Sequence, residues 1–140
     1  MAYVRLVFAL LIMSTLSFAG EVAWVKNYDD ALRQAAQQKK AVILDMSASW
    51  CGFCRKMTRE VYPDQEFVDY SRSHVFVRLF ADTDPQGEQL ANRFGIRGFP
   101  TILVLNPQGK ELGRVVGFRP SGRLIQELQE ITQRAPAANR

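Results

Sequence analysis

The sequence contains few of the residues that build metal sites and disulfide scaffolds. Its 140 residues include two cysteines and one histidine, whereas a structural zinc site takes four ligands. An exported protein held together by disulfides usually carries four, six or eight cysteines at spread spacings. Covalent haem attachment takes a histidine directly after a Cys-x-x-Cys pair, and here Arg55 follows Cys54. Zinc and haem sites are therefore only weakly supported.

Proline, glycine and clustered charge are also scarce. Six prolines and nine glycines exclude a collagen-like or low-complexity chain. The net charge of +4 is spread along the chain, without a basic run interleaved with aromatic residues. We therefore expect no nucleic-acid partner. With 47% apolar residues the chain can bury a core, and its length favours one domain, which we expect to be monomeric.

The longest apolar stretch lies at the N-terminus. Arg5 precedes the apolar run 6–13, and Ser17-Phe18-Ala19 fits the small-residue rule for signal peptidase. The pattern predicts a signal peptide over residues 1–19, cleaved after Ala19, and hence an exported, periplasmic protein. An uncleaved membrane anchor is the alternative, but a membrane span takes about 20 apolar residues and this run is shorter.

The rest of the chain alternates between helix and strand patterns, which predicts an α/β fold. Helices are expected over 28–40, from the cysteine pair to about 61, over 64–71, over 84–94 and from about 120. Strands are expected over 41–46, 74–80, 101–105 and 111–116. The turn signal Asn106-Pro107-Gln108-Gly109 joins the last two strands into an antiparallel hairpin. We expect one domain over 20–134 and a flexible tail over 135–140.

Cys51 and Cys54 lie where an apolar strand ends and a helix begins. A bond between them closes too small a loop to stabilise the fold much. Reactive groups collect beyond the carboxyl ends of strands in open α/β sheets. The pair therefore favours a thioredoxin-like redox site. Two inert buried cysteines are the alternative.

Two segments carry a resemblance to a known family. The segment 44–57, Leu-Asp-Met-Ser-Ala-Ser-Trp-Cys-Gly-Phe-Cys-Arg-Lys-Met, resembles the active-site stretch of thioredoxins. The segment 96–102, Ile-Arg-Gly-Phe-Pro-Thr-Ile, is similar to the cis-proline loop of that family. The similarity runs from about Val22 to Ile131. It is strongest to exported thioredoxin-like proteins, including the C-terminal periplasmic domain of the membrane thiol:disulfide interchange transporter. Phe53 stands where cytosolic thioredoxins usually have proline.

The resemblance implies a thioredoxin-like fold, with a central mixed sheet flanked by helices and a C-terminal hairpin. The cysteine positions then predict the chemistry. Cys51 at a helix N-terminus is stabilised as a thiolate and attacks a client disulfide. Cys54, one turn further along, resolves the mixed disulfide and leaves the Cys51–Cys54 pair oxidised.

Four further residues are candidates for the site. Asp45 is an acid in an otherwise apolar strand, where desolvation favours its protonated form and lets it take a proton from Cys54; a solvent-facing strand-end Asp is the alternative. Trp50 is expected at the rim of the site; a plain packing role is the alternative. The resemblance implies that Pro100 is cis, and that the Phe99 backbone binds an extended client segment.

These residues predict an exported thiol-disulfide oxidoreductase. Neither Gly52 nor Phe53 can supply a cation between the cysteines, which favours a protein-disulfide reductase or an electron relay. We expect client proteins with disulfides and a membrane electron donor as partners, and no cofactor apart from the redox-active disulfide. The alternatives are a disulfide isomerase or oxidase, and a non-catalytic thioredoxin-fold binding module.

Overall fold

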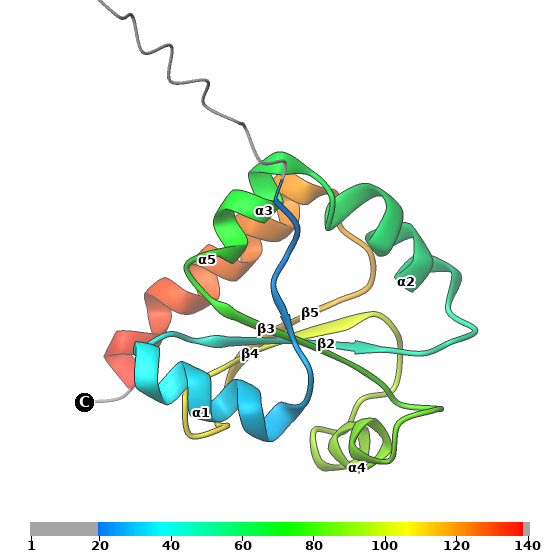
Figure 1. Cartoon of the computed structure of the whole chain (residues 1–140), viewed down its shortest axis with the longest axis horizontal. Helices are drawn as coiled ribbons and strands as arrows, with labels where there is room; N and C mark the ends of the chain where they lie inside the picture. Colours follow the sequence, from blue (N-terminus) through cyan, green and yellow to red (C-terminus); the bar gives the residue numbers. More distant parts are fainter. Residues whose placement is uncertain (1–19, 139–140) are drawn as a thin grey trace, which may run out of the picture.

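Five strands form one sheet in the order β1-β3-β2-β4-β5 in the computed structural model, which describes residues 20–138. The strands are β1 (Trp24–Val25), β2 (Val42–Ser47), β3 (Val75–Phe80), β4 (Thr101–Leu105) and β5 (Glu111–Val116). The helices are α1 (Tyr28–Gln38), α2 (Gly52–Lys56), α3 (Gln65–Ser71), α4 (Pro85–Arg93) and α5 (Ser121–Ala138), and the π-helical turn η1 (Met57–Val61) follows α2 directly. Figure 1 shows the sheet between two layers of helices.

The sheet is mixed, as predicted. β1 and β2 run parallel to β3, whereas β4 is antiparallel to both β2 and β5. The predicted turn between β4 and β5 is closed by a hydrogen bond of 2.9 Å from the Gly109 N–H to the Asn106 carbonyl. The Asn106 side chain accepts from the N–H groups of Gln108 and Lys110. The C-terminal hairpin is therefore confirmed.

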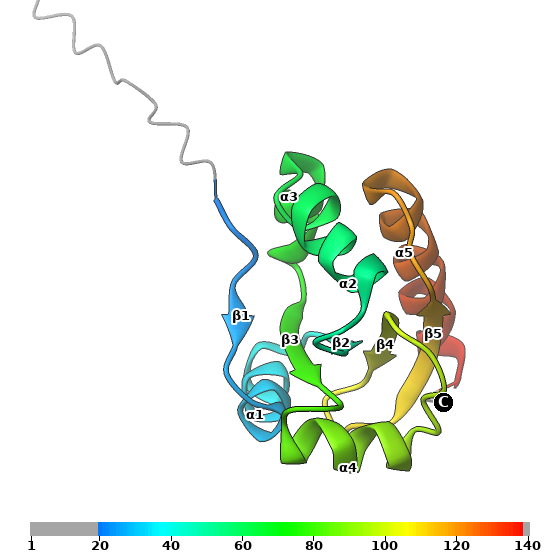
Figure 2. The same cartoon turned by 90° about the vertical axis from the view of Figure 1, so that its right-hand side faces the viewer.

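Successive residues of β2 point to opposite faces of the sheet. Leu44 and Met46 pack in the core beneath α1 and α4, while Ile43 packs in the core beneath η1, α3 and α5. Figure 2 shows the same two layers, with α1 and α4 on one side and α2, α3 and α5 on the other. Asp45, two residues after Ile43, therefore points to the face that α2 covers.

Some boundaries differ from the predicted ones. α1 ends at Gln38 rather than residue 40 because Lys39 adopts the left-handed conformation, with φ of 54°. The helix after the cysteine pair becomes the π-turn η1, closed by the Tyr62 N–H on the Met57 carbonyl at 3.1 Å. β1 has only two residues and was not expected.

Two of the predicted segments lie at the ends of the chain. α5 continues to Ala138 and so extends into the segment 135–140, where the sequence predicts a tail. The predicted signal peptide, residues 1–19 with its cleavage position, lies outside the described residues. No helix within residues 20–138 is long and apolar enough to cross a membrane.

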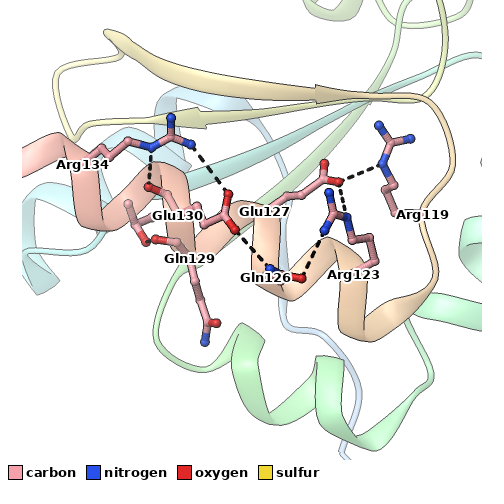
Figure 3. A network of polar contacts seen from close by, with 8 residues as sticks. Arg119, Arg123, Gln126, Glu127, Gln129, Glu130 and Arg134 are labelled. Carbon is pink, nitrogen blue, oxygen red and sulfur yellow. Dashed lines mark hydrogen bonds and ion pairs between the residues drawn. The ribbon is translucent and has the colours of Figure 1, made fainter.

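The outer face of α5 carries a chain of charged contacts (Figure 3). Glu127 accepts from Arg123 at 2.7 Å and from Arg119 at 3.1 Å, and Gln126 donates to Glu130 at 3.2 Å. The basic side chains on this helix are therefore paired with acidic ones on the same surface. Exposed pairs of this kind contribute little to stability.

Candidate active site

Cys51 and Cys54 form a disulfide at the start of α2, with their Cα atoms 5.3 Å apart. Cys51 is the N-cap residue, and its sulfur accepts a hydrogen bond of 3.1 Å from the Cys54 N–H. Both cysteines are buried, in a small cluster with Ala48 against which Phe99 packs. Helix N-terminal N–H groups stabilise negative charge, so this position favours a thiolate on Cys51 when the pair is reduced.

Asp45 lies on β2, on the sheet face that α2 covers, and is 3% exposed. One of its oxygens, Oδ2, accepts from Arg78 Nε at 2.7 Å and from the Tyr62 hydroxyl at 2.8 Å. The Arg78 partner comes from sheet register, since Asp45 and Arg78 are paired residues of β2 and β3. Asp45, Arg78 and Tyr62 are called the carboxylate cluster below.

The second oxygen of Asp45 differs from the first. Oδ1 is buried and has no hydrogen-bond partner within the part of the chain that the structure describes. The carboxylate cluster thus holds one oxygen with two donors and leaves the other free. From the sequence we expected Asp45 to be affected by desolvation alone, whereas in the structure it has a cationic partner, Arg78, and a hydroxyl partner, Tyr62.

The two partners of Asp45 are themselves strongly affected by it. Burial, followed by the neighbouring Asp45 carboxylate, holds the pKa of the Tyr62 phenol well above its usual value. Burial alone would lower the pKa of Arg78, but Asp45 and Tyr62 outweigh it and the net pKa is raised. Both groups are therefore protonated donors at neutral pH. The Arg78 guanidinium also lies over the rings of Trp24 and Tyr62, 4.4 and 4.6 Å from their centroids.

The carboxylate cluster is connected to the helix that carries the cysteines. Arg78 Nη1 donates to the Thr58 hydroxyl at 3.3 Å, and that hydroxyl donates to the Cys54 carbonyl at 3.2 Å. Neither Arg78 nor Tyr62 was singled out from the sequence. The available signal was Arg78 itself, a lone cation in the apolar strand Val-Phe-Val-Arg-Leu-Phe.

The predicted client-binding residues come together at the disulfide. The Phe99–Pro100 peptide bond is cis, as the family resemblance implies. Phe99 packs against the cysteine cluster and makes an edge-to-face contact with Trp50, at 5.8 Å between ring centroids. Trp50 is 67% exposed, which places it on the surface rather than in the core.

A second aromatic pair involves Phe53, which lies between the two cysteines in the sequence. Phe53 is 61% exposed and stacks on Phe118 at 6.4 Å, with Lys56 Nζ 4.5 Å from the centroid of the Phe118 ring. Phe118 follows β5 and is far from Phe53 in the sequence, so no local pattern indicates this contact. Trp50, Phe53, Phe99 and Phe118 are called the aromatic rim below.

A side-chain contact anchors the loop that precedes the disulfide. Asp82 accepts from the Ser49 N–H at 2.9 Å and also from the Ser49 hydroxyl, and these bonds lower the pKa of the Asp82 carboxyl. Arg55 Nη1 donates to the Ser49 carbonyl at 3.2 Å. Trp50 is therefore attached to a fixed backbone segment. Across residues 20–138, no three His, Cys, Asp or Glu side chains gather closely enough to hold a metal ion.

Comparison with known proteins places this site in context. The family of thioredoxin-like domains matches residues 28–132. The thiol:disulfide interchange protein DsbD of Pseudoalteromonas atlantica is 36% identical over 100 residues, which cover 67% of this chain and 17% of that protein. The disulfide bond reductase DsbH of Chlamydia pneumoniae is 29% identical over 114 residues, 74% of this chain and 68% of that protein.

The fold is shared with solved structures as well. A thioredoxin from Thermus thermophilus superposes with a TM-score of 0.75 at 26% identity, covering 86% of this chain and 95% of that one. The chain spans less than a fifth of the DsbD relative, given the 17% coverage. Because the family match extends over residues 28–132 and includes the Cys51–Cys54 disulfide, the chain belongs to the family of thioredoxin-like domains.

Proposed function

We propose that the protein is a thiol-disulfide oxidoreductase that reduces protein disulfides, or relays electrons to other thiol proteins, through Cys51 and Cys54. The observation that carries this proposal is the Cys51–Cys54 disulfide at the start of α2, beside the cis Phe99–Pro100 bond. The names of two relatives, a thiol:disulfide interchange protein and a disulfide bond reductase, support it.

The reaction uses the two cysteines in sequence. In the reduced protein the Cys51 thiolate attacks one sulfur of a client disulfide, and the other client sulfur leaves as a thiolate. The Cys54 thiol then loses its proton and attacks Cys51, which breaks the mixed disulfide and releases the second client thiolate. Two electrons pass to the client, and Cys51–Cys54 becomes the disulfide. The hydrogen bond from the Cys54 N–H to the Cys51 sulfur supports Cys51 as the thiolate.

Asp45 is proposed as the base for the second step. It is buried within β2, on the sheet face that α2 covers, and its Oδ1 has no hydrogen-bond partner within the described residues. A carboxylate with a free oxygen can accept the proton that Cys54 must lose. Arg78, which bonds Asp45, also donates to the Thr58 hydroxyl, and Thr58 donates to the Cys54 carbonyl. These bonds connect the surroundings of Asp45 to the backbone of Cys54, which supports this role.

The aromatic rim is proposed as the client-binding surface. An extended client segment would lie along Phe99 and Pro100, with backbone hydrogen bonds to Phe99 in the manner of strand addition. The exposed face of Trp50 would contact its side chains. Exposed aromatic residues provide a large contact area at low entropic cost, which suits a protein that accepts several clients.

The direction of electron flow is proposed to be reductive. Gly52 and Phe53 bring no cation or hydrogen-bond donor to the Cys51 sulfur, so thiolate stabilisation is moderate. We expect a reduction potential nearer thioredoxin's roughly −270 mV than the oxidase value of about −120 mV. Equilibration against glutathione buffers measures it, and a potential above about −150 mV would favour the isomerase or oxidase alternative.

Insulin reduction by dithiothreitol separates an enzyme from a binding module. The wild-type protein should accelerate the reaction, whereas Cys51→Ser should leave only the uncatalysed rate. A binding module with the same fold would give no acceleration in either form. This comparison tests turnover without a known client.

Export is proposed from the N-terminal sequence. We expect cleavage after Ala19, one domain over 20–134 with a tail over 135–140, and a monomer in the periplasm. Mass spectrometry of the protein recovered from cells should give a chain that begins at Gly20, and a retained Met1 would contradict cleavage.

A reductase in an oxidising compartment needs a membrane electron donor. Alkylation and gel shift should therefore find the cysteine pair largely reduced in cells, and a fully oxidised pair would contradict a donor.

A further inference from the structure

A groove continues from the aromatic rim, between η1, α3 and the start of α5. It encloses about 480 Å³, and its walls include Lys56, Glu60, Glu66, Phe118, Pro120 and Gly122. The ring of Phe118 belongs to both surfaces, because it lines this groove and stacks on Phe53, 6.4 Å away between ring centroids. A client segment that lies on the aromatic rim can therefore extend into the groove, which is called the α3–α5 groove below.

Carboxylates outnumber cations in the α3–α5 groove, although the whole chain carries a net charge of +4. The lining has the three carboxylates of Glu60, Asp64 and Glu66 and one ammonium group, that of Lys56. Asp64 is engaged in the fold, since it caps α3 and accepts from the Ser121 hydroxyl at 3.1 Å. Glu66 makes no ion pair within the part of the chain that the structure describes. The groove thus keeps negative charge that the fold leaves unpaired.

The arginines at the start of α5 are held outside this lining. Arg119 donates to Glu127 at 3.1 Å, and Arg123 donates to the same carboxylate at 2.7 Å (Figure 3). Both guanidinium groups are therefore balanced by an acid that does not line the groove. A cation for Glu66 has to come from solution or from a binding partner.

Lys56 shows how the groove holds a positive charge. Its Nζ atom lies 4.5 Å from the centroid of the Phe118 ring and 3.9 Å from Glu60 Oε2. An aromatic face and a carboxylate together form a favourable site for an ammonium or guanidinium group. Glu66 adds a second carboxylate, whose Oε2 lies 3.9 Å from the position that a Cβ atom would take on Gly122. The carboxylate of α3 is therefore close to the wall formed by α5.

We propose that the α3–α5 groove binds a lysine or arginine side chain of the client. The protein then prefers client segments in which an apolar residue contacts the aromatic rim and a basic residue reaches the groove. This inference rests on the proposed function and names the class of client for the same site. An acidic client residue at that position meets like charge from Glu60 and Glu66 and is disfavoured.

Disulfide-linked dimers of a short peptide with one cysteine test this preference. Three peptides differ only in carrying arginine, glutamine or glutamate at one position, which is moved within about four residues of the cysteine, because an extended chain rises about 3.3 Å per residue. Acid quenching and chromatography give the second-order rate constant at which each peptide oxidises the reduced protein. At the best position the arginine peptide should react about threefold to fivefold faster than the glutamine peptide, the size of one exposed ion pair, and the glutamate peptide should react more slowly. Added salt should reduce the difference.

Glu60→Gln combined with Glu66→Gln removes both charges and keeps the shape of both side chains. The preference for arginine should be lost in this double variant. It should persist in Glu88→Gln, the matched control, which removes an exposed carboxylate from the first turn of α4 instead of α3. A preference that survives in the double variant, or is lost in the control, would overturn the inference. So would a faster reaction of the glutamate peptide, which would assign client selection to exposed cations such as Arg97.

Binding without turnover separates this inference from the proposed function. The oxidised wild-type protein, labelled with ¹⁵N, is titrated with the arginine and glutamine peptides after serine has replaced their cysteine. The arginine peptide should shift the amide signals of Glu66 and of residues 118–122 more than the glutamine peptide does, and the signals of α4 should stay in place. Equal shifts with both peptides would contradict a cation site, even if every peptide were reduced. If the arginine peptide alone shifts these signals but no peptide oxidises the reduced protein, the proposed function is wrong and the cation site stands.

Discussion

The carboxylate cluster and the aromatic rim are built in opposite ways. In the carboxylate cluster, Asp45 and Tyr62 are buried, Arg78 is partly buried, and each member has a partner from another element of the fold. The aromatic rim, in contrast, exposes Trp50 by 67% and Phe53 by 61%, and these side chains pack against the rings of Phe99 and Phe118, respectively. The carboxylate cluster can hold its side chains in one arrangement for proton transfer, while the exposed aromatic rim can adapt to different clients. Substitutions in the two regions should therefore change different quantities.

Arg78→Met should have the largest effect, on stability. The change leaves the buried Asp45 charge without its cation, and breaking such a pair costs about 3 kcal/mol or more. Urea unfolding at pH 7 measures the free energy of unfolding. Arg59→Met, at an exposed position on η1, is the control and should change it little. A loss below about 1 kcal/mol for Arg78→Met would mean that the pair is not an important part of the fold.

Asp45→Asn should mainly change a rate. Asparagine keeps an oxygen that can accept from Arg78 and Tyr62, so the fold should be retained, but it cannot act as a base. General-base catalysis typically contributes about a hundredfold or more, so resolution of the mixed disulfide should slow by about that factor near pH 7. Stopped-flow kinetics with a pre-formed mixed disulfide measure this. Unchanged kinetics from pH 6 to 8 would remove Asp45 from the mechanism.

Trp50→Ala and Phe53→Ala should change client affinity and leave stability nearly unaltered. Each removes an exposed aromatic contact, and one such contact contributes on the order of 1 kcal/mol to binding. We expect KM for a protein disulfide to rise by severalfold, with the rate on a small-molecule disulfide unchanged. Equal losses on both substrates would show that the aromatic rim affects the cysteines rather than the client.

The smallest effect should come from His74, which directly precedes β3. Burial lowers the pKa of its imidazole, so the folded protein binds this proton less readily than the unfolded chain does. The stability contribution is then present above the ordinary value of 6.5 and declines as the pH falls through the lowered folded value. Unfolding at pH 7.5 and pH 5 should show the decline, and His74→Gln should reduce it. An unchanged pH dependence in His74→Gln would assign the decline to other groups.

The sequence predicts those parts of the fold that depend on local patterns. The bounds of β4 and β5 are as expected because the turn at 106–109 and the apolar runs beside it are contiguous signals. The position of the cysteine pair at a strand–helix junction is likewise local. β1, with two residues, is too short to give a periodic pattern and is defined by its pairing with β3.

The remaining parts of the site depend on contacts between distant segments. Asp45 meets Arg78 through the register of two parallel strands, and Phe53 meets Phe118 through the packing of α2 against the loop after β5. Single-sequence patterns carry no information on such pairs. The cis bond at Phe99–Pro100 was expected from family resemblance, because the residues alone indicate only a turn.

Trapping of client mixed disulfides tests the central claim, that the two cysteines have different roles, most directly. Cys54→Ser retains the attacking thiolate but lacks the resolving one, so it should accumulate mixed disulfides with client proteins on non-reducing gels. Cys51→Ser retains the resolving thiol only and should accumulate none. The reverse pattern, with trapping by Cys51→Ser and none by Cys54→Ser, would contradict the assignment of Cys51 as the nucleophile.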